Sequence, residues 1–329
     1  MMTRTSHNCD LGQAFFPVKE IPIFLEGFGV SRKPIPGYKA IVEMESGKAL
    51  SVVSSNYRLI RNEEAYKIAD IVVRSIFEGK TLRDFSCYNI HMPKTKGSCR
   101  IDLIIENHFN QLFGNPSESW TPFVRISNSY NRTLTLRYDI GLCRWICKNG
   151  VIFGHKGISF SVTHEGRITD KEIDRLIERA KSNIGSIGSL WHDFEVKMNT
   201  LHEIALPASS ALAIYCKAFG ISVKKDDVTK AQESRLALCA KQIVTASKDY
   251  FKELGNNAYA MMNVLTDYAS FPEWANGSTN YVDGYQRRVG RWVDEFLQEH
   301  GKQNFSLSAY IGDEYQNTAY YLESLVPQE

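Results

Sequence analysis

The sequence predicts an α+β fold, in which a mixed, β-containing half (residues 1–165) is followed by a mainly helical half (residues 166–329). The first half contains short β-rich segments separated by turn residues, whereas from about Gly166 the apolar residues recur at intervals of three and four. The first half carries 21 Lys and Arg against 15 Asp and Glu, and the second half carries 18 against 22. We therefore expect two domains, divided where the apolar period changes.

One helix and six strands are predicted in the first half. The helix begins after Asn62, a residue type that caps helices, and ends near Gly79, with an apolar stripe at helical spacing between them. Alternating or β-branched apolar residues mark the strands. The predicted strands span residues 48–60, 85–92, 99–107, 121–129, 132–138 and 157–164.

Six helices are predicted in the second half. The first begins at Thr169, with Glu172 three residues later, which is the spacing of a capping box, and extends to Ile204. The others have apolar stripes of the same period. They span Ala208–Phe219, Asp226–Lys241, Ala246–Tyr268, Tyr281–His300 and Ser306–Leu325.

Composition indicates an ordinary globular protein. Hydrophobic residues make up 43% and charged residues 23% of the 329 residues, and no apolar run is long enough for a membrane span. The first residues lack the apolar core of a secretory signal. Seven scattered cysteines are typical of free thiols in a reducing compartment, so we expect a cytoplasmic protein.

The segment "LCRWICKNG" (residues 142–150) holds two cysteines four residues apart. It has neither the second ligand pair of a zinc site nor a Cys-x2-Cys redox motif. Ile140, Cys143 and Cys147 fit a helical stripe that ends at Asn149-Gly150, and we favour this interpretation. The alternative is a hairpin turn at Asn149-Gly150 between two strands.

The same region resembles a known family. "NSYNRTLTLRYDIGLCRWICKNG" (128–150), "VVSSNYRLIRNEEAY" (52–66) and "NNAYAMMNVLTDYASF" (256–271) resemble motifs of the phage/plasmid-like proteins of domain of unknown function 932. Arg132 stands where the family usually has glycine. The resemblance implies a phage or mobile-element context and no established chemistry. The residues that match the signature are Asn128, Ser129, Arg144, Cys147, Asn149 and Gly150.

No constellation of residues indicates catalysis. Asp193, Glu195 and Lys197, with Asp174 upstream, are the nearest candidates for a metal nuclease, but on a predicted helix they are more typical of a solvated face. The sequence has no Gly-x-Ser-x-Gly elbow and no phosphate-binding loop. We therefore expect no enzyme activity, no metal site and no cofactor.

Two groups of residues are candidates for binding. Basic residues interleaved with aromatics can follow a nucleic-acid backbone and stack on bases, and such a face would comprise Arg125, Arg132, Arg137, Arg144 and Lys148. Arginine and aromatic residues are also enriched at protein interfaces. A candidate protein interface comprises Arg287, Arg288, Arg291 and Trp292, although Trp292 also fits a buried helical stripe.

These observations predict a protein that acts by binding. In its most concrete form, it is a phage or mobile-element accessory protein that oligomerises on a host nuclease-type immune complex and blocks it sterically. The alternatives, in order, are a protein that binds single-stranded nucleic acid or assists recombination, and a metal-dependent nuclease. A protein partner is expected ahead of nucleic acid, and no membrane contact is expected.

Overall fold

The structure is a computed structural model, and it confirms the predicted α+β class. Strands dominate up to residue 162, and helices dominate from residue 187 onward. The structure describes residues 9–27, 30–77, 79–105, 110–144, 150–151, 158–162, 171, 174–175, 177–178, 187–224, 227–275 and 281–326.

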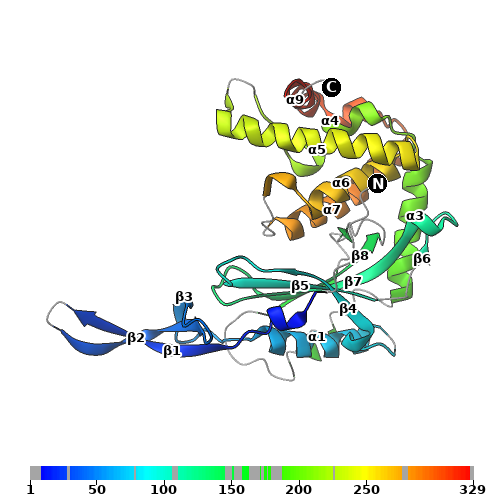
Figure 1. Ribbon diagram of the computed structural model, residues 1–329. Helices are drawn as coiled ribbons and strands as arrows, with labels where there is room; N and C mark the ends of the chain where they lie inside the picture. The colour runs from blue at the N-terminus through cyan, green and yellow to red at the C-terminus, as the bar shows by residue number, and fades with distance from the viewer. Residues whose placement is uncertain are drawn as a thin grey trace.

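The body has three layers, with a sheet in the middle, one helix on one face and the helical half on the other (Figure 1). The sheet has the order β10-β8-β7-β5-β4, with β6 beside β7 and β9 beside β8, and every pairing is antiparallel. Its strands are β4 (Phe85–His91), β5 (Ser98–Ile105), β6 (Asn110–Gln111), β7 (Ser119–Ser129), β8 (Leu136–Arg144), β9 (Gly150–Val151) and β10 (Ile158–Val162).

Helix α1 (Asn62–Ile76) covers the apolar face of this sheet. Its buried residues Ala65, Ala69, Val72 and Val73 follow the predicted stripe. Opposite them lie cross-strand rows of apolar residues, which include Ile101, Ile126 and Tyr138 in register. The Tyr138 hydroxyl donates a hydrogen bond to the Ala65 carbonyl over 2.9 Å. The helix begins at Asn62 itself, one residue earlier than predicted.

The helical half packs around α6, which is almost wholly buried. A long helix, α5, lies along α6, and α7 lies on its other side toward the sheet (Figure 1). The described helices are α3 (Ile187–Glu203), α4 (Ala211–Phe219), α5 (Lys230–Leu254), α6 (Ala258–Ser270), α7 (Val282–His300), α8 (Leu307–Ile311) and α9 (Asp313–Ser324). None of these described helices has the length and apolar composition to span a bilayer.

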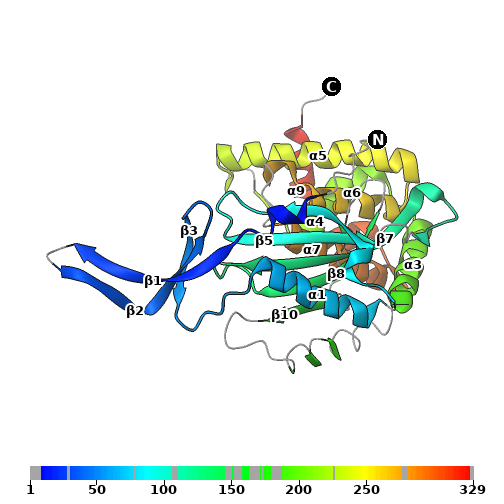
Figure 2. The same ribbon diagram turned by 60° about the horizontal axis from the view of Figure 1, so that its bottom comes forward.

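A second, three-stranded sheet projects from the body (Figures 1 and 2). It contains β1 (Val18–Gly27), β2 (Val30–Glu43) and β3 (Ala49–Ser54) in sequential antiparallel order. We call this sheet the arm. Only β3 was predicted, because prolines at positions 22, 34 and 36 interrupt the alternation that identifies strands.

The arm is fixed to the body at its base. A small core there contains Phe16, Val18, Ile41 and Val53 from the arm side, together with Tyr57 and Tyr130. The Tyr57 hydroxyl donates to the Ser129 carbonyl over 2.7 Å, and Ser51 Oγ donates to the Tyr130 carbonyl. Lys96 forms an ion pair with Glu43, which is buried. The base of the arm is therefore part of the packed structure.

The predicted break between two helices near residue 243 is wrong. Helix α5 runs unbroken to Leu254, and the chain turns at Gly255, where φ is +88° and glycine is favoured. Asn257 then caps α6 by accepting a hydrogen bond from the Ala260 amide over 2.8 Å. The predicted helix 306–325 is likewise divided at Gly312 (φ +84°). The predicted capping residues Thr169 and Glu172 lie outside the described residues.

The prediction of a helix over residues 140–148 is also wrong for residues 140–144, the part that the structure describes. Ile140 and Cys143 lie on strand β8, on opposite faces of the sheet, so they do not form one stripe. Strands β8 and β9 pair antiparallel, as in a hairpin, but Gly150 is paired with Cys143 as part of β9, so the predicted turn at Asn149-Gly150 is wrong as well. Helical spacing was misleading because intervals of three and four occur by chance in a short apolar run.

Candidate functional site

The sheet face that points away from α1 carries charged residues at its centre. Asp102 on β5, Arg125 on β7 and Asp139 on β8 lie directly opposite one another in register. Arg100 and Arg137 occupy the neighbouring row on the same face, two residues along their strands. This face is covered by α7, so the charges lie between two layers of the fold.

Helix α7 contributes an acid that joins three strands. The Asp283 carboxylate accepts hydrogen bonds from Arg100 Nε over 2.9 Å, from Arg125 Nη1 over 2.5 Å and from Arg137 Nη2 over 2.6 Å. Asp283 is buried. One turn later, the Gln286 side-chain oxygen accepts from Arg125 over 3.0 Å. Through these contacts α7 is held to the sheet.

Arg125 is the central member of this group. Its guanidinium donates to both carboxylate oxygens of Asp102, over 2.6 and 2.7 Å, and this two-point pairing is the strongest arrangement for an arginine and a carboxylate. Only 2% of the residue is exposed. Asp139 binds Arg137 over 2.9 Å and also pairs with Arg287. The charge network thus comprises Arg100, Asp102, Arg125, Arg137, Asp139, Asp283, Gln286 and Arg287.

The arginines keep Asp102 and Asp283 ionised. Burial by itself raises the pKa of Asp283, but the charges of Arg125, Arg100 and Arg137 outweigh it and lower this pKa to about 2. Burial likewise opposes ionisation of Asp102, and Arg125 outweighs it, so that the pKa of Asp102 is also lowered. Groups that remain charged near neutral pH are suited to ion pairing and not to proton transfer.

A second ionic cluster joins the sheet to α5 and α6. Arg144 on β8 is fully buried and forms an ion pair with Glu118, and it reaches Glu253 over 3.0 Å. The Tyr259 hydroxyl donates to Glu118 over 2.6 Å, and Trp120 Nε1 donates to the Tyr259 oxygen over 3.0 Å. Two separate sets of buried charges therefore hold the helical half on the sheet.

The structure does not bring the five candidate nucleic-acid residues together as an exposed face. Arg125 and Arg144 are buried in ion pairs, and Arg137 is bound by Asp139 and Asp283. Arg132 is exposed in the turn after β7, and Lys148 lies outside the described residues. Of the five, Arg125 and Arg137 share one face of the sheet. The sequence did not show that a helix covers this face.

Two family-signature residues have structural roles. The Asn128 side-chain amide donates to the Ile60 carbonyl over 2.8 Å and to the Asn62 side-chain oxygen over 2.9 Å, which ties β7 to the start of α1. Ser129 Oγ donates to the Leu134 carbonyl over 2.7 Å and closes the turn after β7. Cys147 and Asn149 lie outside the described residues.

The candidate protein-interface residues on α7 do not form one surface. Arg287 points to the sheet and pairs with Asp139, and Trp292 is buried and stacks on Phe296 with ring centroids 5.2 Å apart. Arg288 donates to the Phe219 carbonyl, and Arg291 is exposed. The buried-stripe interpretation therefore describes Trp292 better.

The nuclease candidates are not gathered at a common site either. Lys197 on α3 forms an ion pair with Asp294 over 2.5 Å. Among the described residues, no three His, Cys, Asp or Glu side chains are arranged to hold a metal ion. Asp174 lies in a stretch of which only a few residues are described.

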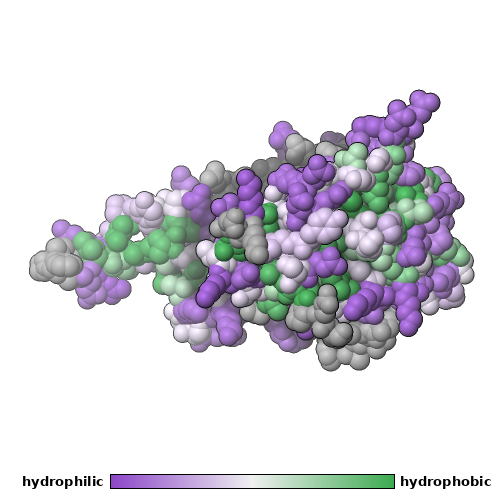
Figure 3. All heavy atoms as spheres, turned by 90° about the horizontal axis from the view of Figure 1, so that it is seen from above, coloured by the Kyte–Doolittle hydropathy of each residue, from purple (hydrophilic) through white to green (hydrophobic). Residues whose placement is uncertain are grey.

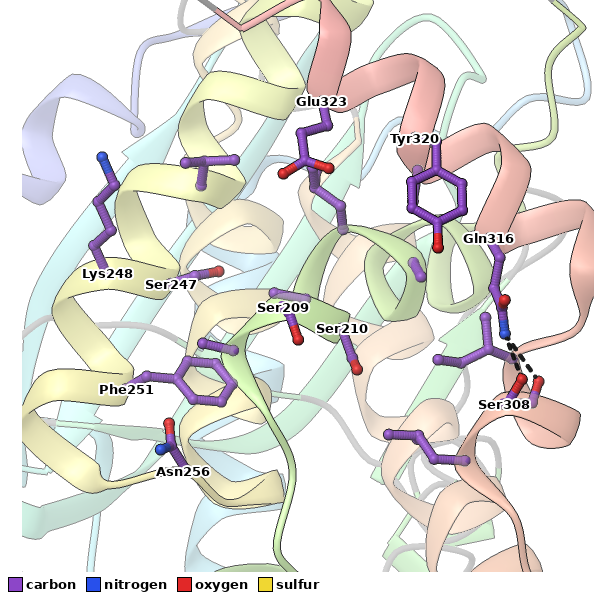
Figure 4. A pocket seen from close by; sticks show the side chains of 18 of the residues that line it. Ser209, Ser210, Ser247, Lys248, Phe251, Asn256, Ser308, Gln316, Tyr320 and Glu323 are labelled. Atoms are coloured by element: carbon purple, nitrogen blue, oxygen red, sulfur yellow. Dashed lines mark hydrogen bonds between the residues drawn. The ribbon is translucent and has the colours of Figure 1, made fainter. Parts of the chain in front are cut away.

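A groove of about 880 Å³ lies between α4, α5, α8 and α9 (Figure 4). Its floor consists of small residues such as Ala211 and Ala213, and its charged residues Lys248, Lys252 and Glu323 are exposed. Gln316 donates to Ser308, so part of the polar lining is already satisfied. Because no charged residue of the groove is buried, it offers none of the strongly desolvated groups on which active sites depend.

The feature that sequence reasoning missed is the outer face of the arm. Ile21, Ala40 and Val52 lie in one row across its three strands, and Tyr38 lies beside this row. Ile21 is 42%, Tyr38 57% and Val52 62% exposed. Figure 3 shows hydrophobic residues along the arm. The alternation "VKEIPIF" (18–24) carried a signal for a strand, but Pro22 concealed it.

Comparison with known proteins gives one match. The family model "Domain of unknown function (DUF932)" matches residues 49–271, which is more than half of the chain. No curated protein and no solved structure matches the chain significantly. The match includes the main sheet, α1 and helices up to α6, whereas β1, β2 and α7 lie outside it.

We predict that Asp283→Asn destabilises the fold strongly. The substitution removes the charge that Arg100, Arg125 and Arg137 share, and breaking a buried ion pair in this way costs about 3–5 kcal/mol. Urea unfolding at neutral pH measures the change. Glu299→Gln, which removes an exposed pair with Lys302, is the matched control and should cost less than about 1 kcal/mol. Equal losses in both variants would contradict this role.

Acid should weaken the wild-type protein through the same residues. A carboxyl group with a lowered folded-state pKa stabilises the fold above its unfolded pKa, and this contribution is lost as the pH falls through the folded-state pKa. For Asp283 the free energy of unfolding should therefore decrease from about pH 4, the ordinary aspartate value, to about 2. Urea unfolding across this range should show a shallower decrease for Asp283→Asn. Parallel pH profiles for both proteins would refute the assignment.

Proposed function

The chain belongs to the family Domain of unknown function (DUF932), and from its geometry we propose that it acts by binding another protein through the arm. The observation that carries this proposal is the exposure of Ile21, Tyr38 and Val52 on one face of the arm, where Ile21 and Val52 flank the buried Ala40 and Tyr38 lies beside this row. Contiguous apolar surface is costly to leave in water, and where it occurs on a folded protein it is typical of an interaction site.

The way in which the arm is mounted supports the same conclusion. The core at its base and the Lys96–Glu43 ion pair fix the arm to the body. Tyr130, which packs in that core, follows Ser129 at the end of the central strand β7. A surface that is held in place before binding loses less conformational entropy when a partner arrives. The charge network and the base of the arm together provide such a rigid mount.

In its finer form, the proposal is that the partner is a host nuclease-type immune complex, and that several copies of this protein assemble on it and block it sterically. The resemblance to phage- and plasmid-borne proteins motivates this form. An arm that extends beyond the body can contact a partner without requiring the body to enter a cleft (Figure 2). Steric blocking requires contact surface and no reactive group, and the arm supplies such surface.

We predict that the arm variant Ile21→Ser/Tyr38→Ser/Val52→Ser loses partner binding by more than about tenfold, because truncating a few central contacts removes most of an interface's energy. Tagged protein is expressed in the host, and co-purifying proteins are quantified by mass spectrometry. The matched control, Ile71→Ser/Val196→Ser/Leu238→Ser, changes helical residues that are 43%, 50% and 47% exposed.

The two variants separate specific from general effects. The control variant should retain the partners of the wild-type protein, and the arm variant should lose them. Equal retention by both variants would refute the role of the arm. The proposed block of a host nuclease-type immune complex is tested by phage plating on a host that carries such an immune system. Expression of the wild-type protein should restore plaques, and expression of the arm variant should not. If the wild-type protein fails to restore plaques, the counter-defence role is refuted, but protein binding through the arm is not.

One observation favours the second candidate function, binding of single-stranded nucleic acid. Near the far end of the arm, the Arg32 guanidinium lies 4.3 Å from the ring centroid of Phe24, beside the exposed Lys33. Exposed cations next to an aromatic ring can hold a phosphate and stack on a base. We therefore propose the arm for this contact, since Arg125 and Arg144 are buried.

For this candidate we predict salt-dependent binding of a fluorescent single-stranded oligonucleotide. Arg32→Glu/Lys33→Glu should weaken binding and reduce the slope of log affinity against log salt, because fewer counterions are released. Fluorescence anisotropy at several salt concentrations measures both quantities. Arg291→Glu, on the exposed side of α7, is the control. An unchanged slope in the arm variant would count against a nucleic-acid role for the arm.

A further inference from the structure

We propose that a pocket in the helical half binds a small planar aromatic anion. The pocket has a volume of about 560 Å³, within the range of ~300–1,000 Å³ that is typical of small-molecule sites. Helices α4, α5, α6 and α7 and the loop after α4 enclose it. We call it the tyrosine pocket, and its lining includes Tyr215, Tyr268, Tyr285, Cys239, Arg235 and Lys224.

The floor of the tyrosine pocket contains an unsatisfied hydrogen-bonding group. Tyr215 is fully buried, and its hydroxyl makes no well-formed hydrogen bond with a described residue; its polar neighbours are the Tyr268 hydroxyl and the Cys239 sulfur. The neighbouring Tyr268 hydroxyl accepts a hydrogen bond from Trp274 Nε1 over 2.9 Å and contacts the Cys239 sulfur at 3.5 Å. A buried polar group without a partner is costly, and a ligand that supplies the missing partner recovers that cost.

Aromatic rings form the inner walls. Tyr268 and Tyr285 stack with ring centroids 5.6 Å apart, and Tyr215 meets Tyr268 edge to face at 4.8 Å. Apolar residues such as Ile221 and Leu236 complete the lining. Aromatic walls favour a planar ring, which can stack on them or meet their edges. Burial raises the pKa of Tyr215 and of Tyr268, so both hydroxyls keep their protons.

The rim of the pocket carries the charge that selects an anion. Arg235 is held over the ring of Trp274, 3.5 Å from its centroid, and it forms no ion pair with a described residue. Lys224 lies on the same rim, and Asp227 is the one acid among the described residues that line the pocket. Two cations and one acid give a net charge of +1, which suits one carboxylate or one phosphate group. A guanidinium fixed by stacking is already oriented to bind such a group.

These three features define the class of ligand as an aromatic ring with a hydrogen-bonding atom at one end and one anionic group at the other. Nucleoside monophosphates and aromatic carboxylates share this chemistry. Tyrosine-rich packing also occurs in ordinary cores. The cavity and the unpaired Tyr215 hydroxyl distinguish this region from a filled core, in which polar groups are paired. The tyrosine pocket is separate from the arm, and the proposal does not depend on the arm's function.

Isothermal calorimetry with four probes tests the proposal, namely AMP, UMP, indoleacetate and hydroxybenzoate. Adenosine lacks the anion and ribose phosphate lacks the ring, so both should bind more weakly than the best probe. Arg235→Gln should weaken that probe by about tenfold or more, since a charge-assisted hydrogen bond is lost. Tyr215→Phe should weaken it by about threefold, as expected for one neutral hydrogen bond.

Matched controls separate the pocket from general effects. Tyr310→Phe removes another buried hydroxyl that lacks a partner, outside this pocket, and Arg291→Gln removes an exposed arginine elsewhere. Both should bind the probe like the wild-type protein. Lys224→Gln should also weaken binding of the probe. If Arg235→Gln does not fold, Lys224→Gln tests the role of the positive charge in its place. Saturable binding by none of the four probes, or equal binding by all variants, would overturn the proposal.

Discussion

The interaction on which the fold depends most is the pairing of Arg125 with Asp102 and Asp283. Arg125 lies at the centre of the sheet, Asp102 lies on the adjacent strand, and Asp283 comes from a helix 158 residues later in the chain. Arg125 pairs with both buried carboxylates at once, and Arg100 and Arg137 add to the positive charge that balances Asp283. The sheet can therefore carry these buried charges only when α7 is packed against it. The orientation of the helical half follows from this contact and from those that Arg144 and Glu118 make with Glu253 on α5 and Tyr259 on α6.

This arrangement gives the two faces of the sheet different roles. The apolar face and α1 form a conventional core, in which area removed from water provides stabilisation without directional demands. The charged face requires that each donor meet its acceptor, so it tolerates few alternative packings. The arm is fixed at the end of this sheet and the tyrosine pocket lies behind α7. Both candidate binding features thus rely on a body whose layers cannot slide past one another.

Much of the body could be predicted from the sequence, because periodicity reports burial directly. The stripe Ala65, Ala69, Val72 and Val73 identified α1, and the alternation around Ile101 and Ile126 identified the central strands. Three features could not be predicted in this way. Pro22, Pro34 and Pro36 hid β1 and β2, a chance helical spacing disguised β8, and Gly255 was the true end of α5. Which element covers a charged face is a long-range property, and no local pattern near Arg125 contains it.

The limits of the family match have a consequence for how relatives of this chain are compared. Residues 49–271 contain Asn128 and Ser129, which tie β7 to α1 and close the turn beside the arm, but they exclude β1, β2 and α7. The match thus covers the main sheet, α1 and the helices up to α6. The β1–β2 hairpin of the arm precedes the matched residues. Two chains that match over this range need not share the arm, so similarity measured over the matched residues does not describe β1 and β2.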